Sequence, residues 1–180
     1  MPPAKAAPAA ARKASPGTGL LFLREEEMRL AQDLLFFANR DLSDAADEAL
    51  EDTGLGRAHH RVLHFVSRQP GLTIAALLDI LRITKQSLNR VLKELVAKGF
   101  IEARAGEIDR RQRQLYVTRE GEKLALDLSR AQTRRFERAM TELGAEGRAE
   151  AIAFLLAMTD AGGRDRIIEL TGVKLPPVFG

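Results

Sequence analysis

The chain of 180 residues contains no cysteine. That absence excludes thiol catalysis, a disulfide framework and thiolate metal sites, and it fits a protein of a reducing cytoplasm. Aromatic residues make up only 5% of the chain, whereas aliphatic residues and alanine are abundant, which is typical of a mostly helical protein. No apolar run approaches the ~20 residues that a helix needs to cross a membrane, so we expect no membrane association. The length suits one core, or one core with an appended dimerisation element.

The motifs of common enzyme classes are also missing. We find no Ser-His-Asp order with a familiar context and no glycine-rich phosphate loop, so we expect no enzymatic activity. All histidines fall on one predicted helix, at His59, His60 and His64, and the spacing of the last two would suit a metal ion. A pair of imidazoles needs further ligands, so we expect a packing or hydrogen-bonded role, and neither a metal nor another cofactor.

The net charge of +3 hides an uneven distribution along the chain. Between Leu21 and Leu55, ten acidic residues stand against three basic ones, a local balance of −7. Between Arg82 and Arg119, ten basic residues stand against four acidic ones, a local balance of +6. Positive charge is therefore gathered in one segment, as expected of a surface that meets a polyanion. The alternative is the ordinary fluctuation of surface charge along a chain.

Residues 72–118 carry the strongest pattern. Two short apolar-periodic helices are joined by a very short turn at Arg82 and Ile83, and a basic, glycine-containing hairpin follows. This order of elements predicts a winged helix-turn-helix, which places one helix in the major groove of DNA and a loop on the neighbouring groove. The expected helices lie at 74–81 and 85–98, and the expected strands at 101–104 and 114–117.

Local signals mark the ends of these helices. Thr73 and Thr84 stand where an N-cap is needed, because a hydroxyl can accept a hydrogen bond from the first turn. Gly99 stands where a helix end needs a left-handed residue. The second helix should bury Leu88, Val91, Leu92 and Leu95, and the first should bury Leu77, Leu78 and Leu81.

The exposed side of the second helix carries the candidate base contacts. Three- and four-residue spacing brings positions 85, 86, 89 and 90 to one side of the helix. Asn and Gln can pair with adenine, and Lys and Arg with guanine, while Thr and Ser at the helix start can donate to phosphate. An ordinary solvated helix face is the alternative. The residues predicted to contact DNA here are Thr84, Lys85, Gln86, Ser87, Asn89 and Arg90.

The hairpin tip gathers three arginines beside one carboxylate: Asp109, Arg110, Arg111 and Arg113. So much positive charge in one loop is unfavourable unless an anion meets it. A wing arginine could enter a narrow, negatively charged minor groove. We expect Asp109 to pair with one arginine, and spacing alone does not decide which.

The run from Leu72 to Gly121 resembles the winged helix-turn-helix of the MarR family. The matching residues are LT at the start, the stretch TKQSLNRVLKELVAKGFIE, the wing motif DRRQRQLYVT and the REG that opens the next helix. The resemblance implies Asp109 and Arg111 as the structural pair and DNA contact of the wing, although Arg110 could take either role. Many members have glycine where this chain has Arg82, so this arginine must accept a strained backbone or a different turn.

The resemblance also implies a homodimer whose terminal helices intertwine. More apolar surface than a small winged helix can cover is offered by the stripe from Leu124 to Leu143, the apolar N-terminal helix and the last helix. This surface needs a partner or intramolecular packing. Pairing with a second copy would place two recognition helices on one side, over half-sites roughly 10 base pairs apart. We therefore expect self-association and double-stranded DNA with an inverted repeat as partners.

Members of this family often bind small phenolic or anionic molecules between the DNA-binding lobe and the dimer helices. By position, such a crevice would be lined by Phe36, Phe37, Asn39, Arg40, His60 and His64. Core packing is the alternative role for both phenylalanines. Whether an effector exists is left open by the sequence.

We thus expect a mostly α fold with a small β wing, that is, a winged helix-turn-helix with N- and C-terminal dimerisation helices. The predicted function is a homodimeric, sequence-specific transcriptional regulator, a repressor, and a response to a small molecule is left open. A protein-interaction adaptor is the alternative, and the basic, polar recognition face disfavours it. The expected parts are a disordered tail at 1–18, an N-terminal helix at 19–56, a DNA-binding domain at 57–118, dimerisation helices at 119–171 and a second tail at 172–180.

Overall fold

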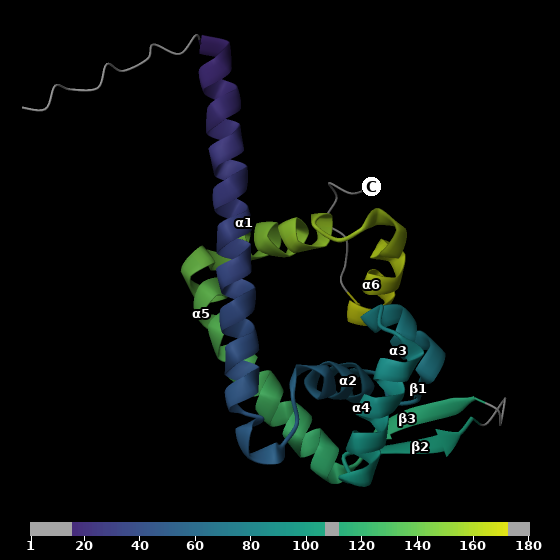
Figure 1. Ribbon diagram of the computed structural model, residues 1–180. Coiled ribbons are helices and arrows are strands. Elements are labelled where there is room, and N and C mark those ends of the chain that lie inside the picture. The colour runs from purple at the N-terminus through teal and green to yellow at the C-terminus, as the bar shows by residue number, and fades with distance from the viewer. Residues whose placement is uncertain (1–15, 107–111, 173–180) are drawn as a thin grey trace, which may run out of the picture. The chain divides into compact units, whose positions relative to one another are not determined.

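A computed structural model describes residues 16–106 and 112–172. The predicted fold class is confirmed, because helices dominate and a small antiparallel sheet forms the wing (Figure 1). In chain order the elements are α1 (Pro16–Glu48), the 3-10 turn η1 (Glu51–Thr53), α2 (Arg57–Arg68), β1 (Leu72–Thr73), α3 (Ile74–Leu81), α4 (Lys85–Ala97), β2 (Ile101–Ala105), β3 (Arg113–Val117), α5 (Arg119–Ala157), η2 (Ala161–Gly163) and α6 (Arg164–Thr171). The chain divides into two compact units after Asp41, and each unit is described by itself.

The first unit is α1 up to Asp41. The helix begins at Pro16, which corrects the expected tail, because residues 16–18 are helical. Proline suits the first turn of a helix, where its missing N–H would have had no partner in any case. Every side chain from Arg24 to Arg40 is exposed, including those of large apolar residues. These exposed apolar residues are Met28, Leu30, Leu34, Leu35, Phe36 and Phe37.

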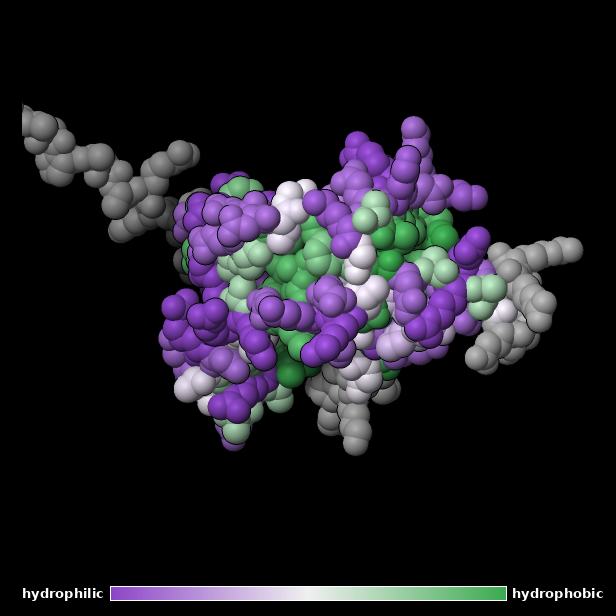
Figure 2. Space-filling view, turned by 90° about the horizontal axis from the view of Figure 1, so that it is seen from below, coloured by the Kyte–Doolittle hydropathy of each residue, from purple (hydrophilic) through white to green (hydrophobic). Residues whose placement is uncertain are grey.

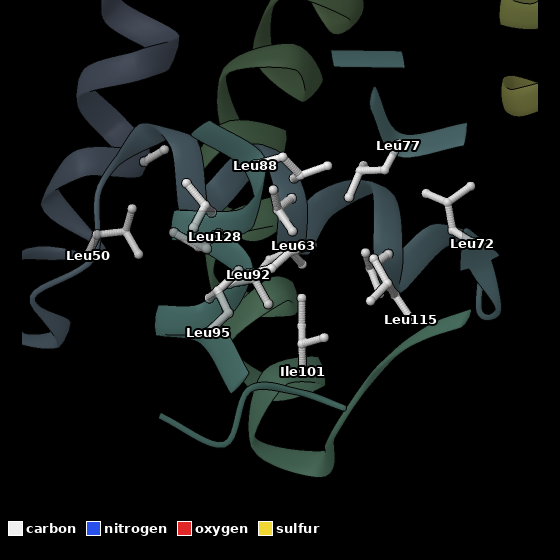
Figure 3. Packing of buried hydrophobic residues seen from close by; sticks show 14 residues of the cluster. Leu50, Leu63, Leu72, Leu77, Leu88, Leu92, Leu95, Ile101, Leu115 and Leu128 are labelled. Atoms are coloured by element: carbon white, nitrogen blue, oxygen red, sulfur yellow. The ribbon is translucent and has the colours of Figure 1, made fainter. Parts of the chain in front are cut away.

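The core of the second unit lies between α2, α4 and the sheet (Figure 3). Val62, Leu63 and Val66 of α2 are buried, whereas Phe65 is half-buried. The prediction for α4 is confirmed, since its leucines and valine at 88, 91, 92 and 95 all belong to the core. In α3 only Leu77 is fully buried. Leu78 and Leu81 are half-buried, because α3 lies at the edge of the cluster and turns one narrow stripe inwards.

The strands pair in the order β1-β3-β2, and both pairings are antiparallel. β1 was not predicted, because its residues Leu72 and Thr73 are too few to show a period of two. The strands of the hairpin are each one residue longer than expected. Leu115 enters the core and Val117 packs against it, while the ring of Tyr116 lies 4.4 Å from the Arg104 guanidinium carbon.

α5 begins at the N-cap Thr118, whose hydroxyl accepts a hydrogen bond from the Gly121 amide at 3.0 Å. Gly144 interrupts this helix, with a φ of 70° and a ψ of −172°. Arg148 donates from Nε to the carbonyl oxygen of Met140 across this break at 2.7 Å. The helix packs against α2 through its first half, where Leu128 is fully buried.

The turn between α3 and α4 contains a strained residue. Arg82 adopts φ 50° and ψ 43°, and it is the one non-glycine residue with positive φ in the described part of the chain. Its amide donates to the Leu78 carbonyl oxygen at 2.9 Å, which closes the end of α3. The left-handed region costs an L-residue roughly 1–2 kcal/mol, so of the two geometries expected here the structure has the strained one.

Arg82→Gly is therefore expected to raise the free energy of unfolding by about 1 kcal/mol, because glycine adopts this backbone conformation without strain. The greater freedom of glycine in the unfolded chain offsets part of the gain. Urea denaturation would measure the change. Arg82→Ala is the matched control, because it removes the same guanidinium and keeps the Cβ. An increase for Arg82→Ala as large as that for Arg82→Gly would contradict the role of the backbone.

Candidate nucleic-acid interface

The start of α4 is held by its own side chains. Thr84 has an extended backbone, and its hydroxyl accepts a hydrogen bond from the Ser87 amide at 3.2 Å, as the predicted N-cap should. The same hydroxyl donates to Ser87 Oγ at 2.9 Å. Both side chains are exposed, so the positive end of the helix dipole and the free amides of its first turn face solvent, where an anion is favoured.

The amphipathic sequence of α4 fixes which side chains point outwards. Because its leucines and Val91 turn into the core, the other face must be solvated. The structure brings Lys85, Gln86, Asn89 and Arg90 together on that exposed face, as predicted. We call this set, with Thr84 and Ser87, the recognition face. It carries side chains that can hydrogen-bond to base edges and to phosphates.

Lys93 extends the recognition face and was missed by the sequence analysis. It is exposed and lies four residues after Asn89, so the same helical spacing could have found it. Asn89 and Lys93 also border an open apolar groove of about 430 Å³, whose floor includes Leu92 and Leu115. On the lower face of the molecule, apolar side chains gather in the middle between hydrophilic margins (Figure 2).

The hairpin of β2 and β3 lies beside α4, and its strands form the base of the predicted wing. The Gly106 amide donates to the Gln112 carbonyl oxygen at 2.9 Å, next to the last strand pair of Ala105 and Arg113. Arg113 is exposed at this base of the wing. The other predicted wing residues, Asp109, Arg110 and Arg111, lie outside the described residues, and their roles stay predictions.

Arg104 adds a further cation to the base of the wing, and the sequence analysis did not single it out. It is exposed on β2, pairs with Glu102 and lies over the ring of Tyr116. Only the pairing of β2 with β3 brings this arginine next to Tyr116, and no local pattern reveals it.

Long-range polar contacts fix α4 to the rest of the core. His59 Nε2 lies 2.9 Å from Glu94 Oε2, and His59 Nδ1 accepts a hydrogen bond from the Gly56 amide at 3.1 Å. A neutral His59 therefore carries its proton on Nε2, and this N–H donates a hydrogen bond to Glu94 Oε2. Lys98 Nζ donates to the Thr53 carbonyl oxygen at 3.0 Å. Both contacts use residues at the carboxyl-terminal end of α4, and neither involves a residue of the recognition face.

The predicted effector crevice would combine residues of both units, so it stays a prediction. In the first unit, Phe36 and Phe37 stack edge to face with ring centroids 5.4 Å apart, and Arg40 lies over Phe37 at 4.9 Å. Both phenylalanines are exposed, so neither packs in the core of the chain. In the second unit, the rings of His60 and His64 lie 6.3 Å apart, edge to face. Asn39, the remaining predicted residue, is an exposed residue of α1.

Burial lowers the pKa of His60 and of His64, and nearby cations, Arg61 for the first and Arg68 for the second, act in the same direction. The Asp47 carboxylate opposes this shift at His60. Across the described residues, no group of three or more His, Asp or Glu side chains is arranged to hold a metal ion. No helix among these residues is long and apolar enough to span a bilayer.

The unfolding free energy is expected to fall as the pH drops below the usual histidine pKa of about 6.5. The lowered pKa values of His60 and His64 mean that the unfolded chain binds protons there that the folded chain does not. Urea midpoints at several pH values, for the natural chain and for the double variant His60→Gln/His64→Gln, would measure this. The variant should show a flatter dependence on pH below neutrality, and an equal dependence in both proteins would refute the assignment.

The fold and the recognition face together define a class of protein: a winged helix-turn-helix transcriptional regulator that binds DNA. The sequence matches the profile of the MarR family over residues 53–112, which include α2, β1, α3, α4 and β2. It is 42% identical over 148 residues to the HTH-type transcriptional regulator PetP of Rhodobacter capsulatus, covering 82% of this chain and 89% of that protein. The chain belongs to the MarR family.

Solved structures agree with this fold. A MarR transcriptional regulator from Methanosarcina mazei Go1 superposes with a TM-score of 0.60 at 22% identity, covering 72% of this chain and 86% of the other. A Mycobacterium tuberculosis MarR family protein in complex with p-aminosalicylic acid gives a TM-score of 0.51 at 25% identity, covering 69% of this chain and 94% of the other. Wild-type MarR from E. coli, in its apo form, gives 0.54 at 20% identity, with coverages of 70% and 93%.

Proposed function

We propose that this regulator is a homodimeric repressor that binds an inverted repeat through the recognition face and the wing of each copy. The observation that carries the proposal is the exposed polar and cationic side of α4, which begins at an exposed N-cap and lies beside a basic hairpin. Lys85, Asn89 and Arg90 suit the major groove, and the arginines of the wing suit the backbone or the minor groove. A repressor follows if the bound site overlaps a promoter, where the protein would exclude polymerase.

Exposed apolar surface supports the homodimer. Leu34 is 58% exposed and Phe36 64% exposed in α1, and Phe136 and Leu143 of α5 are also exposed. Soluble proteins rarely leave so many large apolar side chains in water without a partner. A second copy would cover equivalent surfaces by two-fold symmetry and would match the symmetry of an inverted repeat.

A response to a small molecule completes the proposal. Its support is the Mycobacterium tuberculosis MarR family protein, which was solved in complex with p-aminosalicylic acid. A ligand that binds more tightly to one arrangement of the two recognition helices would shift the protein towards that arrangement. The resulting change in DNA affinity is limited by the difference between the affinities of the ligand for the two arrangements.

Sequencing the genomic fragments that the purified protein retains at physiological salt tests the proposed function. We expect the fragments to share an inverted repeat with half-sites about one DNA turn apart. Retention of no fragment, or of fragments without a shared repeat, would refute sequence-specific binding. Transcription from a promoter with that repeat, measured with and without the protein, distinguishes repression from activation.

Leu34→Glu is expected to convert the dimer to a monomer, because it places a charge in the apolar surface of α1. Sedimentation velocity would show the change in mass. Binding to the inverted repeat should weaken by on the order of 100-fold, since two linked half-site contacts become independent. Gln32→Glu adds the same charge beside it and should leave a dimer. A dimeric Leu34→Glu variant would contradict the role of this surface.

A further inference from the structure

A cavity of about 480 Å³ separates α3 from the carboxyl-terminal segment that contains η2 and α6. In Figure 1, α6 lies next to α3, on the side of the helix-turn-helix away from the hairpin. Half-buried apolar side chains line it, namely Phe65 of α2, Ile80 of α3, and Ile167 and Leu170 of α6. Its size falls within the roughly 300–1,000 Å³ of pockets that bind small molecules.

Charged groups of both signs lie at the border of this cavity. Arg82 and Asp160 face each other with 3.7 Å between Nη2 and Oδ2, and their side chains are 69% and 72% exposed. So long and exposed an ion pair contributes little, and a ligand can separate it at small cost. Asp79 is a second carboxylate of the lining. Arg166 also lines the cavity, but its guanidinium is engaged with Glu169 at 2.6 Å.

The Arg82 guanidinium lies close to the backbone of the carboxyl-terminal segment. The backbone of Arg82 is held in the left-handed region at the end of α3, and a Cβ at Gly163 would lie only 3.3 Å from Nη2. The backbone of Gly163 therefore lies next to this guanidinium. A guanidinium can take a carboxylate through two parallel hydrogen bonds, and this one lies at the border of the cavity.

We propose that this cavity binds a small zwitterion with an apolar body, of the class of α-amino acids with large apolar side chains. The carboxylate of the ligand binds Arg82, and its ammonium binds the carboxylates of Asp160 and Asp79. The apolar side chain lies between Phe65, Ile80, Ile167 and Leu170. A simple organic anion would pair only with the arginine at the border of the cavity, and a simple organic cation only with the carboxylates. The site is distinct from the crevice predicted at Phe36, Phe37, Asn39, Arg40, His60 and His64.

The consequence for DNA binding rests on the proposed function. Arg82 lies two residues before Thr84, the N-cap of the recognition helix, so a ligand that holds Arg82 acts on the turn that positions α4. Ligand binding and DNA binding are then coupled, and each must change the affinity of the other by the same factor.

Methyl NMR of the full chain, labelled at isoleucine, tests the site without DNA. The probes are L-phenylalanine, 3-phenylpropanoate, which lacks the ammonium, and phenethylamine, which lacks the carboxylate. We expect L-phenylalanine to shift the methyl signals of Ile80 and Ile167, and each analogue to bind at least about tenfold more weakly. Equal binding of 3-phenylpropanoate would overturn the zwitterion assignment. No shift of either methyl at millimolar L-phenylalanine would overturn the site itself.

Variants identify the charged partners. Arg82→Gly keeps the turn and Asp79→Asn keeps the volume, and each is expected to weaken binding of L-phenylalanine by about tenfold or more. Arg130→Gln removes a guanidinium from α5 and should bind the probe as the natural chain does. Unchanged binding by both Arg82→Gly and Asp79→Asn would overturn the proposal. The NMR experiment contains no DNA, so a negative result would overturn the amino-acid site without bearing on the proposed DNA binding. In the same way, a failure to retain genomic fragments would refute the proposed DNA binding without bearing on this site.

Discussion

Arg90→Glu is expected to weaken DNA binding by on the order of 100-fold. Arg90 is exposed on the recognition face beside Gln86 and Asn89. Losing one arginine contact to a base costs roughly 1–3 kcal/mol, and the new carboxylate adds repulsion from the phosphates. Fluorescence anisotropy with a labelled duplex taken from the retained genomic fragments would measure the change.

Arg130→Glu is the matched control for this charge reversal. Arg130 is exposed on α5 and is not part of the recognition face, which lies on α4. Helix α2 packs against both α4 and α5. The control changes the net charge by the same amount, so it corrects for any general effect of charge on affinity. It should alter the dissociation constant by less than about threefold. Equal weakening by both variants would show that total charge, and not the recognition face, governs binding.

Gly121→Ala is expected to have the largest effect on stability. A Cβ at Gly121 would lie 1.9 Å from the Phe100 carbonyl oxygen, and this oxygen also accepts a hydrogen bond from the Thr118 amide at 3.1 Å. Neither backbone can move without breaking the junction between the hairpin and α5. The cost should be about 3 kcal/mol or more, at the upper end of what an overpacked core shows. Urea denaturation, or loss of the soluble protein, would report it.

Gly162→Ala provides the control for the glycine replacement. A Cβ at Gly162 would have no atom within 4 Å, so the change adds the same methyl group without a collision. We expect the free energy of unfolding to change by no more than about 0.5 kcal/mol. A similar loss of stability in both variants would contradict the close approach of Phe100 as the cause.

Features with a local cause could be predicted from the sequence. The apolar spacing in α4 determined which side chains are buried and hence which form the recognition face. The hydroxyl of Thr84 caps the helix as its position indicated, and Gly99 adopts the expected positive φ of 75°. Each of these depends on residues within one or two turns of the chain, so sequence spacing contains the information.

Features that depend on distant segments could not be predicted. β1 exists because Leu72 pairs with Leu115, and the link between His59 and Glu94 joins residues that lie 35 positions apart. The cavity beside Arg82 requires the carboxyl-terminal segment to pack against α3. The sequence indicated that Arg82 was unusual, but only the structure shows that its backbone is strained.

The dependence of DNA affinity on salt measures whether α4 and the wing neutralise phosphates of the duplex. We would measure the dissociation constant for a retained duplex between about 50 and 200 mM KCl, with the natural chain and with Arg90→Glu. We expect the natural chain to lose at least about 100-fold in affinity over this range, because several phosphates are neutralised. The variant should show a shallower slope. An affinity that is independent of salt, or no binding to any duplex at 50 mM KCl, would contradict the assignment of α4 and the wing as the DNA-binding surface.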